Sequence, residues 1–171
     1  MTVAVVDRVD ADDRLDGPKH FASAVSSARA VSTIDMSAIV ANWAMLADEV
    51  TPTECGAVIK ASAYGLGDDF AQLLARDLHD AGCRTFFVAT IDEALALGNI
   101  GDNAAVYVLD GYRDTRADDY GAHIRPVLST RAQISEFAAR AGRLQHKLPA
   151  AVHIDTGMAR LGLSPEDVET L

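Results

Sequence analysis

The chain has 171 residues, of which 25 are acidic and 15 are basic, so its formal net charge is -10. A chain of this length can bury one substantial core, and the acidic excess argues against a nucleic-acid surface or an anionic membrane as partner. No apolar stretch approaches the roughly 20 residues that cross a bilayer, and we expect no export signal in the N-terminal segment, which has no basic start or continuous apolar region. The expected partners are therefore small molecules or proteins. Cys55 and Cys83 fit reduced thiols in a cytoplasmic protein.

The N-terminal segment differs from the rest of the chain. Residues 1–28 show little periodicity and are expected to form a disordered leader, with the folded portion at 29–171. A β-rich run at 30–34 precedes Asp35, which can cap a helix whose apolar residues recur at helical spacing. Pro52 should end that helix, because the residue before a proline disfavours helical conformation.

From residue 55 onward, apolar runs alternate with stretches of helical periodicity. Strands are expected near 55–60, 85–89, 104–109, 123–127 and 150–155. Helices are expected near 68–80, 91–98, 114–120 and 130–142. Because the strands are nearly continuous apolar runs, they predict an α/β fold with a parallel sheet covered on both faces. This pattern fits an open doubly wound sheet or a barrel.

A last helix is expected to begin at Ser164, where serine can cap, Pro165 fits the first helical position and acidic residues follow. The chain stops about one turn later, so we expect a fragment of something longer. About five barrel-type strands are predicted, whereas a closed α/β barrel has eight. Exposed strand edges predict an isolated chain that is unstable unless the remainder is supplied.

Lys60 stands where an apolar run meets the glycine-rich turn 61–67. Barrels of this class present catalytic groups at the carboxyl ends of strands, and an amine there can bond to a carbonyl carbon. Small residues after Lys60 leave space for a flat ring, and Gly65 and Gly67 allow an anion to approach the backbone closely. Tyr64 is either a packed aromatic or a phosphate ligand. The alternative is a lysine at the solvent end of a strand.

A second junction of this kind follows the strand-like run 150–154. Arg160 lies beyond this strand end, and a guanidinium is a planar partner for a carboxylate or a cofactor oxygen. Lys60 and Arg160 together suggest one anionic site, although a surface arginine is the alternative. Asp155 is expected to fix the turn, and His153 is interpreted as a core histidine. No zinc-site spacing or phosphate-loop motif occurs.

Read together, segments 57–67 and 153–162 resemble the alanine racemase family. The helix entry at 34–42 and the segment 92–95 are similar to that family in order and spacing, so the resemblance covers roughly residues 30–171. It implies the N-terminal part of a fold-type III enzyme that depends on pyridoxal 5′-phosphate (PLP). It also implies a partial (β/α)8 (TIM-type) barrel of about five βα units, without the rest of the barrel or the C-terminal β-domain.

The resemblance implies a complete protein that works as a homodimer and interconverts L-alanine and D-alanine, with D-alanine destined for peptidoglycan. Lys60 is then the catalytic lysine that forms the Schiff base with the cofactor, and Tyr64 binds the cofactor phosphate. Arg160 contacts the cofactor's phenolic oxygen and the substrate carboxylate, and no metal is implied. The base on the opposite face of the substrate is, in the family, a tyrosine from the neighbouring subunit. Many members carry a carbamylated lysine at the position of His153, whose ring could instead orient Arg160.

Three alternatives stand beside this interpretation. A racemase of broader specificity on the same scaffold would also accept serine and lysine. A truncated, non-catalytic chain would bind PLP without forming the other isomer. The third alternative is a gene fragment without function, which the presence or absence of a longer reading frame downstream would resolve.

Overall fold

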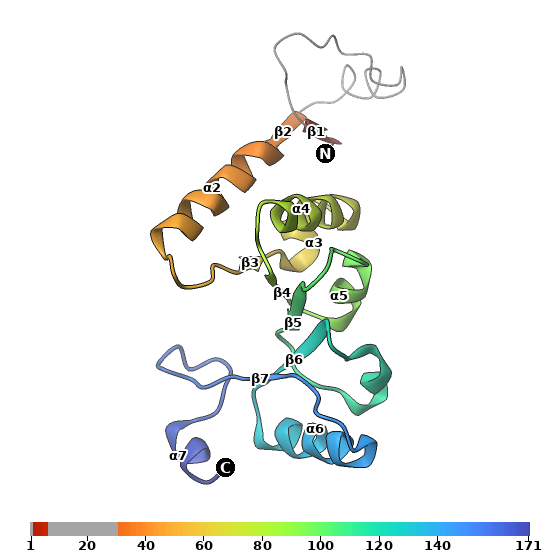
Figure 1. The fold of residues 1–171 in the computed structure, drawn as a ribbon, viewed down its shortest axis with the longest axis vertical. Coiled ribbons are helices and arrows are strands. Elements are labelled where there is room, and N and C mark those ends of the chain that lie inside the picture. Colours follow the sequence, from red (N-terminus) through yellow and green to blue (C-terminus); the bar gives the residue numbers. More distant parts are fainter. Residues whose placement is uncertain (1, 7–30) are drawn as a thin grey trace. The chain divides into compact units, whose positions relative to one another are not determined.

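The computed structural model describes residues 2–6 and 31–171 (Figure 1). The chain divides into two compact units, Met1–Cys55 and Gly56–Leu171. In the first unit, β1 (Thr2–Val6) pairs in parallel with β2 (Val31–Asp35). The sequence analysis assigned no strand to residues 2–6, and the rest of the expected leader lies outside the described residues.

Helix α2 (Met36–Glu49) follows β2 and begins where the sequence predicts. Asp35 is its N-cap, because Asp35 Oδ1 accepts hydrogen bonds from Ser37 Oγ at 2.6 Å and from Ala38 N at 3.0 Å. These bonds hold the pKa of the Asp35 carboxyl below its ordinary value. Trp43 lies within α2, and its Nε1 donates a hydrogen bond to Cys55 O at 3.2 Å. This bond connects the segment that follows the helix to α2.

The second unit contains a five-stranded sheet in the order β3-β4-β5-β6-β7, in which every pair is parallel. Its strands are β3 (Ala57–Val58), β4 (Thr85–Val88), β5 (Ala105–Val108), β6 (Ile124–Leu128) and β7 (Ala151–Val152). The α/β fold with a parallel sheet is thus confirmed. Because all five strands run the same way, their carboxyl ends lie at one edge of the sheet.

The connections between the strands contain α3 (Lys60–Gly65), α4 (Asp68–Asp80), α5 (Ile91–Leu97), η1 (Asp114–Asp119) and α6 (Arg131–Leu144), and α7 (Pro165–Glu169) follows β7. The serine cap that the sequence predicts for the last helix is present, and Ser164 forms a capping box with Asp167. The helix expected at 114–120 is instead a 3-10 turn. Its arginine, Arg116, bonds locally to Asp119 at 2.6 Å, and the segment has no apolar stripe to bury as an α-helix.

The two faces of the sheet differ. Phe86, Val88, Val106 and Val108 are at most 4% exposed and pack under the helices, which lie along one side of the strands (Figure 1). The next residues along β4 and β5, Phe87 and Tyr107, point to the other face and are only half-buried. The sequence analysis expected both faces to be covered. This was wrong for the second face, where aromatic and arginine side chains cover one another.

That second face carries a row of side chains from three adjacent strands. The rings of Phe87 and Tyr107 stack with centroids 5.4 Å apart, and Arg125 lies over Tyr107 at 5.6 Å while its Nη1 donates to Tyr107 Oη at 3.1 Å. Such stacking and cation–π contacts stabilise neighbouring strands across a sheet.

None of the helices within the described residues has the length and apolar composition that a membrane-spanning helix needs.

The buried face generates a stability prediction. Phe86→Ala removes a ring that is 0% exposed, and we expect it to lower the free energy of unfolding by about 3–5 kcal/mol in urea titrations of the purified chain. Leu73→Ala is the control, because Leu73 is 48% exposed on α4 and its truncation should change that free energy by less than about 0.5 kcal/mol. Equal losses in the two variants would contradict the assignment of Phe86 to the core.

Candidate active site

Lys60 lies at the carboxyl end of β3, as predicted. The residue before it, Ile59, is 4% exposed and donates its backbone N–H to Phe87 O at 3.0 Å, which extends the pairing of β3 with β4 by one residue. Lys60 itself is half-buried. Among residues 31–171, no side chain forms a hydrogen bond or ion pair with its amine. The amine therefore stands at the sheet edge and is available to a ligand.

Tyr64 lies in a turn of unusual backbone conformation. Residues Ala61, Ser62, Ala63 and Tyr64 all have φ between 50° and 57° and ψ between 38° and 56°, so α3 is a left-handed turn. For residues other than glycine, each such conformation costs about 1–2 kcal/mol, and strain of this kind gathers at functional sites. The sequence analysis expected a glycine-rich turn here but not this handedness.

Hydrogen bonds and burial hold the turn in place. Ala63 is 4% exposed and donates its N–H to Ile59 O at 3.2 Å, and Gly67 N donates to Ser62 O at 2.9 Å. Tyr64, in contrast, is 66% exposed. No atom lies within 4 Å of the position that a Cβ would occupy at Gly65 or Gly67. The solvent side of the turn is therefore open around Tyr64 and its two neighbouring glycines.

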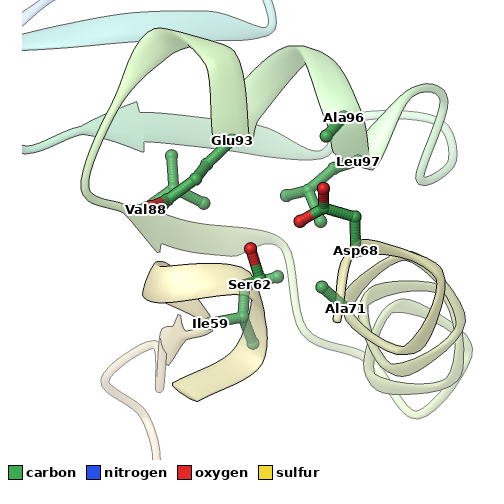
Figure 2. A pocket seen from close by; sticks show the side chains of 8 residues that line it. All are labelled: Ile59, Ser62, Asp68, Ala71, Val88, Glu93, Ala96 and Leu97. Carbon is green, nitrogen blue, oxygen red and sulfur yellow. The ribbon is translucent and has the colours of Figure 1, made fainter. Parts of the chain in front are cut away.

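A small cavity lies behind the turn, between α3, α4, α5 and β4 (Figure 2). Its volume is about 10 Å³, and Ser62 and Asp68 direct side-chain oxygens toward it. That volume suits about one water molecule, so it is too small for a cofactor ring. A larger hollow of about 330 Å³ lies at the amino ends of β5 and β6, between Gly101, Asp102 and His123. Neither space contains Lys60, Tyr64 or Arg160.

Arg160 is exposed on the 155–162 loop, beyond the carboxyl end of β7. Asp155 begins this loop and holds its backbone, because Asp155 Oδ1 accepts hydrogen bonds from Gly157 N at 2.9 Å and Ala159 N at 3.1 Å. The two backbone bonds also hold the pKa of the Asp155 carboxyl below its ordinary value. The expectation that Asp155 fixes the turn is thus confirmed.

His153 is half-buried at the end of β7, and its Nδ1 lies 3.3 Å from Ser129 Oγ. Ser129 follows β6 and is 7% exposed. The sequence analysis did not single out Ser129, although its position directly after a predicted strand could have indicated it. It also passed over Asp110, which follows β5. Burial raises the pKa of the Asp110 carboxyl, and among the described residues its Oδ1 has no hydrogen-bond partner.

The predicted site residues all follow the carboxyl ends of strands of one sheet. Lys60 and Tyr64 follow β3 and Arg160 follows β7, and these strands are the two ends of the five-stranded order. Within the described ranges, no hydrogen bond or ion pair joins any two of the three side chains. A phenol hydroxyl and a guanidinium can each bind an anionic group, and a primary amine can bond to a carbonyl carbon.

Comparison with known proteins gives the same family along most of the chain. The family described as alanine racemase, N-terminal domain, matches residues 34–171. The alanine racemase of Methylobacterium nodulans is 49% identical over 146 residues, which are 85% of this chain and 39% of that protein. The catabolic alanine racemase of Agrobacterium fabrum is 46% identical over 141 residues, or 81% of this chain and 36% of that protein. The chain thus spans about two fifths of the length of these curated relatives.

Solved structures give the same result. Alanine racemase from Bartonella henselae, solved with covalently bound pyridoxal phosphate, superposes with a TM-score of 0.73 at 41% identity, over 80% of this chain and 38% of that one. Histidine racemase from Leuconostoc mesenteroides gives a TM-score of 0.61 at 30% identity, over 79% of this chain and 36% of that one. The five-stranded parallel sheet therefore resembles the N-terminal barrel domain of alanine racemases. The resemblance found in the motifs is confirmed, and the chain belongs to the alanine racemase family, whose N-terminal part it matches over residues 34–171.

Proposed function

We propose that this chain forms the lysine-bearing part of the active site of a PLP-dependent alanine racemase. The observation that carries the proposal is the position of Lys60, half-buried at the carboxyl end of β3 and beside an open turn. The names of the relatives, alanine racemases at 43–49% identity, supply the substrate and the reaction. The covalently bound pyridoxal phosphate of the Bartonella protein supplies the cofactor.

The side chains around Lys60 fit this cofactor. The Lys60 amine can bond to its aldehyde, and the exposed Tyr64 hydroxyl can donate a hydrogen bond to its phosphate. The open space at Gly65 and Gly67 lets a phosphate approach the backbone of the turn. When bound, PLP supplies an electron sink that stabilises the negative charge left at the substrate's α-carbon.

Lys60 then moves the proton at the α-carbon. Once the amine of the substrate has replaced Lys60 at the aldehyde, the free Nζ would accept that proton on one side of the substrate, and inversion requires a second group to deliver a proton to the opposite side. The family resemblance implies that this group is a tyrosine of a second copy, so the proposal includes a homodimer. The same resemblance leads us to propose a cytoplasmic protein whose D-alanine enters peptidoglycan. We also propose that residues 1–28 are a leader and that residues 29–171 are the barrel portion.

Arg160 binds the substrate carboxylate in this proposal. Its guanidinium matches a carboxylate with two parallel hydrogen bonds, which a lysine cannot reproduce. The loop that carries it is held by Asp155 through two backbone amides, which limits the loss of conformational freedom when a substrate binds. By the same family resemblance, Arg160 would also help to hold the cofactor through its phenolic oxygen.

A second candidate function is racemisation of a broader set of amino acids. The similarity to a histidine racemase, at 30% identity with a TM-score of 0.61, supports this second candidate. Turnover of histidine, serine or lysine at rates comparable to that of alanine would favour this candidate. Binding of PLP without any isomer formation would instead indicate a non-catalytic PLP-binding chain.

The lysine assignment has a direct test. We expect PLP to bind covalently at Lys60, because the amine has no competing partner among the described residues. Borohydride reduction followed by peptide mapping should find the cofactor on Lys60 in the wild-type chain and in Lys147→Ala, a control at an exposed lysine, but not in Lys60→Ala. Modification of Lys60→Ala to the wild-type extent would refute the assignment.

Racemisation itself should be measured with the chain alone and with the remaining part of the Methylobacterium nodulans relative supplied as a second polypeptide. Formation of D-alanine from L-alanine in either sample supports the proposal. If covalent PLP is present and neither sample forms the other isomer, the proposed activity is wrong and the non-catalytic candidate stands.

The proposed binding roles of Tyr64 and Arg160 predict that substitutions at the two positions weaken the binding of different ligands. Tyr64→Phe removes a hydrogen bond to an anion and should weaken PLP affinity by about tenfold. Arg160→Lys removes the paired contact and should raise the KM for alanine by at least about tenfold. PLP titrations and initial rates measure the two effects, with Arg76→Lys on the exposed face of α4 as control. A Tyr64→Phe variant with unchanged PLP affinity would remove Tyr64 from the phosphate site.

The loop that carries Arg160 should loosen in acid. Because the folded-state pKa of Asp155 lies below its ordinary value of 3.8, the stabilisation is fully present above that pH and is lost as the pH falls through the lowered pKa. NMR shifts of the Gly157 and Ala159 amides should titrate with a midpoint below 3.8. Asp155→Asn keeps an accepting oxygen and should abolish the titration. A midpoint at or above the ordinary value would contradict these hydrogen bonds.

A further inference from the structure

The cavity behind the left-handed turn of α3 combines apolar walls with polar side chains (Figure 2). Four of its apolar lining residues are at most 4% exposed, namely Ile59, Ala71, Val88 and Leu97. Ser62 directs its hydroxyl toward this space from α3, and Asp68 directs its carboxylate toward it from the first turn of α4. A hydroxyl that faces an apolar space is destabilising unless it finds a hydrogen-bond partner there.

The Ser62 and Asp68 side chains have no such partner in the protein. Within residues 31–171, neither side chain forms a hydrogen bond or an ion pair. Glu93 of α5 also lines the cavity, and its Oε2 accepts a hydrogen bond from Ala89 N at 2.8 Å. Among the described residues, no group bonds to its other oxygen, Oε1. Polar side chains from α3, α4 and α5 therefore border one small space that a bound molecule could bridge.

The size of the cavity and the chemistry of its polar groups fit water. A space of about 10 Å³ holds about one water molecule. Water can accept the hydrogen of the Ser62 hydroxyl and donate one hydrogen to each of the carboxylates of Asp68 and Glu93. Its own hydrogen-bonding groups and those of the three side chains are then used together.

A metal ion fits the same groups poorly. Hard cations such as Mg²⁺ and Ca²⁺ take about six or more oxygen ligands. In the part of the chain that the structure describes, no group of three or more His, Cys, Asp or Glu side chains could hold a metal ion. The lining thus offers too few ligands for a cation and enough for water.

We propose that this cavity is a binding site for a single water molecule, held by Ser62, Asp68 and Glu93. The water connects α3 to α4 and α5. Because Asp68 is exposed, the molecule exchanges with bulk solvent on that side. A buried water that makes about three hydrogen bonds is part of the structure and is costly to remove.

The bound water adds to the contacts that hold the strained turn. The backbone bonds of this turn are those from Ala63 N to Ile59 O at 3.2 Å and from Gly67 N to Ser62 O at 2.9 Å, with a longer one from Leu66 N to Ala63 O at 3.4 Å. The water connects the side chain of Ser62, in the middle of the turn, to two neighbouring helices. Its loss should let the turn open more often, whether or not the protein racemises an amino acid.

NMR of the purified chain can detect this water through the methyl groups of Val88 and Leu97, which carry no exchangeable hydrogen. We expect nuclear Overhauser cross-peaks between these methyl groups and water, with the sign of a long-lived bound molecule. Asp68→Ala should reduce their intensity at least about threefold, because the water loses one of its bonds. Asp69→Ala is the matched control, since Asp69 is the next exposed acid in the first turn of α4 and does not line the cavity.

The same variants separate bound water from the hydroxyl hydrogen of Ser62, which also exchanges with solvent. Asp68→Ala keeps that hydroxyl, so cross-peaks of unchanged intensity in this variant would overturn the proposal. Their absence from the wild-type spectrum would overturn it as well. A dependence of the wild-type cross-peaks on sodium or potassium, replaced at constant ionic strength by tetramethylammonium, would assign the site to a monovalent cation instead of water.

Hydrogen exchange tests the consequence for the turn. The Gly67 amide should exchange about tenfold faster in Ser62→Ala and in Asp68→Ala, because the turn opens more often. Asp69→Ala and Ser135→Ala, at an exposed site on α6, should leave its exchange within about twofold of the wild type. Unchanged Gly67 exchange in Asp68→Ala would overturn the role of the water in holding the turn. If Ser62→Ala fails to fold, Asp68→Ala and its control Asp69→Ala carry the same comparison.

Discussion

The parallel hydrogen-bond ladder of the second unit is the constraint on which the candidate site depends. The registers Val58↔Phe87, Val88↔Val108 and Leu128↔Val152 bring the ends of successive strands to one edge. Groups that follow different strands, at residues 60, 129 and 160, therefore gather at the same edge although they are far apart in sequence. An antiparallel arrangement would send every second group to the opposite edge. Parallel α/β folds place their ligands at this edge for the same reason.

The left-handed turn after β3 is the costliest local feature of that edge. Its conformation is held by the buried Ala63, by the bond from Gly67 N to Ser62 O and by packing against α4 and α5. Residues that disfavour a conformation persist in it only when the surrounding structure fixes them. Burial, this hydrogen bond and the packing thus hold the short segment that carries Lys60 and Tyr64 in one conformation. A rigid segment suits a site that must hold a flat cofactor in one orientation.

The features predicted from the sequence were those that a short stretch of chain determines. Apolar runs located four strands to within about two residues at each end, and the caps at Asp35 and Ser164 marked two helix starts because their side chains bond to nearby amides. The 3-10 turn at Asp114–Asp119 was predicted as a helix because its polar periodicity does not distinguish the two. The left-handed turn was missed because no local preference of alanine, serine or tyrosine favours it.

In the candidate site, too, the features that a short stretch of chain determines were predicted and those that depend on the whole sheet were not. Lys60 and Arg160 were placed at strand ends from the residues alone, and both lie there. Their separation across five strands depends on register and sheet order, which no short segment encodes. Ser129 was missed for a related reason, since its contact with His153 joins residues of neighbouring strands that are 24 positions apart.

The distribution of aromatic residues gives the two units separate optical signals. The single tryptophan, Trp43, belongs to Met1–Cys55, and its indole is bonded to the backbone of Cys55 at the end of that unit. All four tyrosines belong to Gly56–Leu171, where Tyr112 and Tyr120 are buried and Phe87 stacks on Tyr107. Selective excitation of the indole therefore reports the environment of the first unit. Near-ultraviolet circular dichroism in the tyrosine region, after subtraction of the overlapping indole contribution, reports packing in the second, so one unlabelled sample can show which unit melts first.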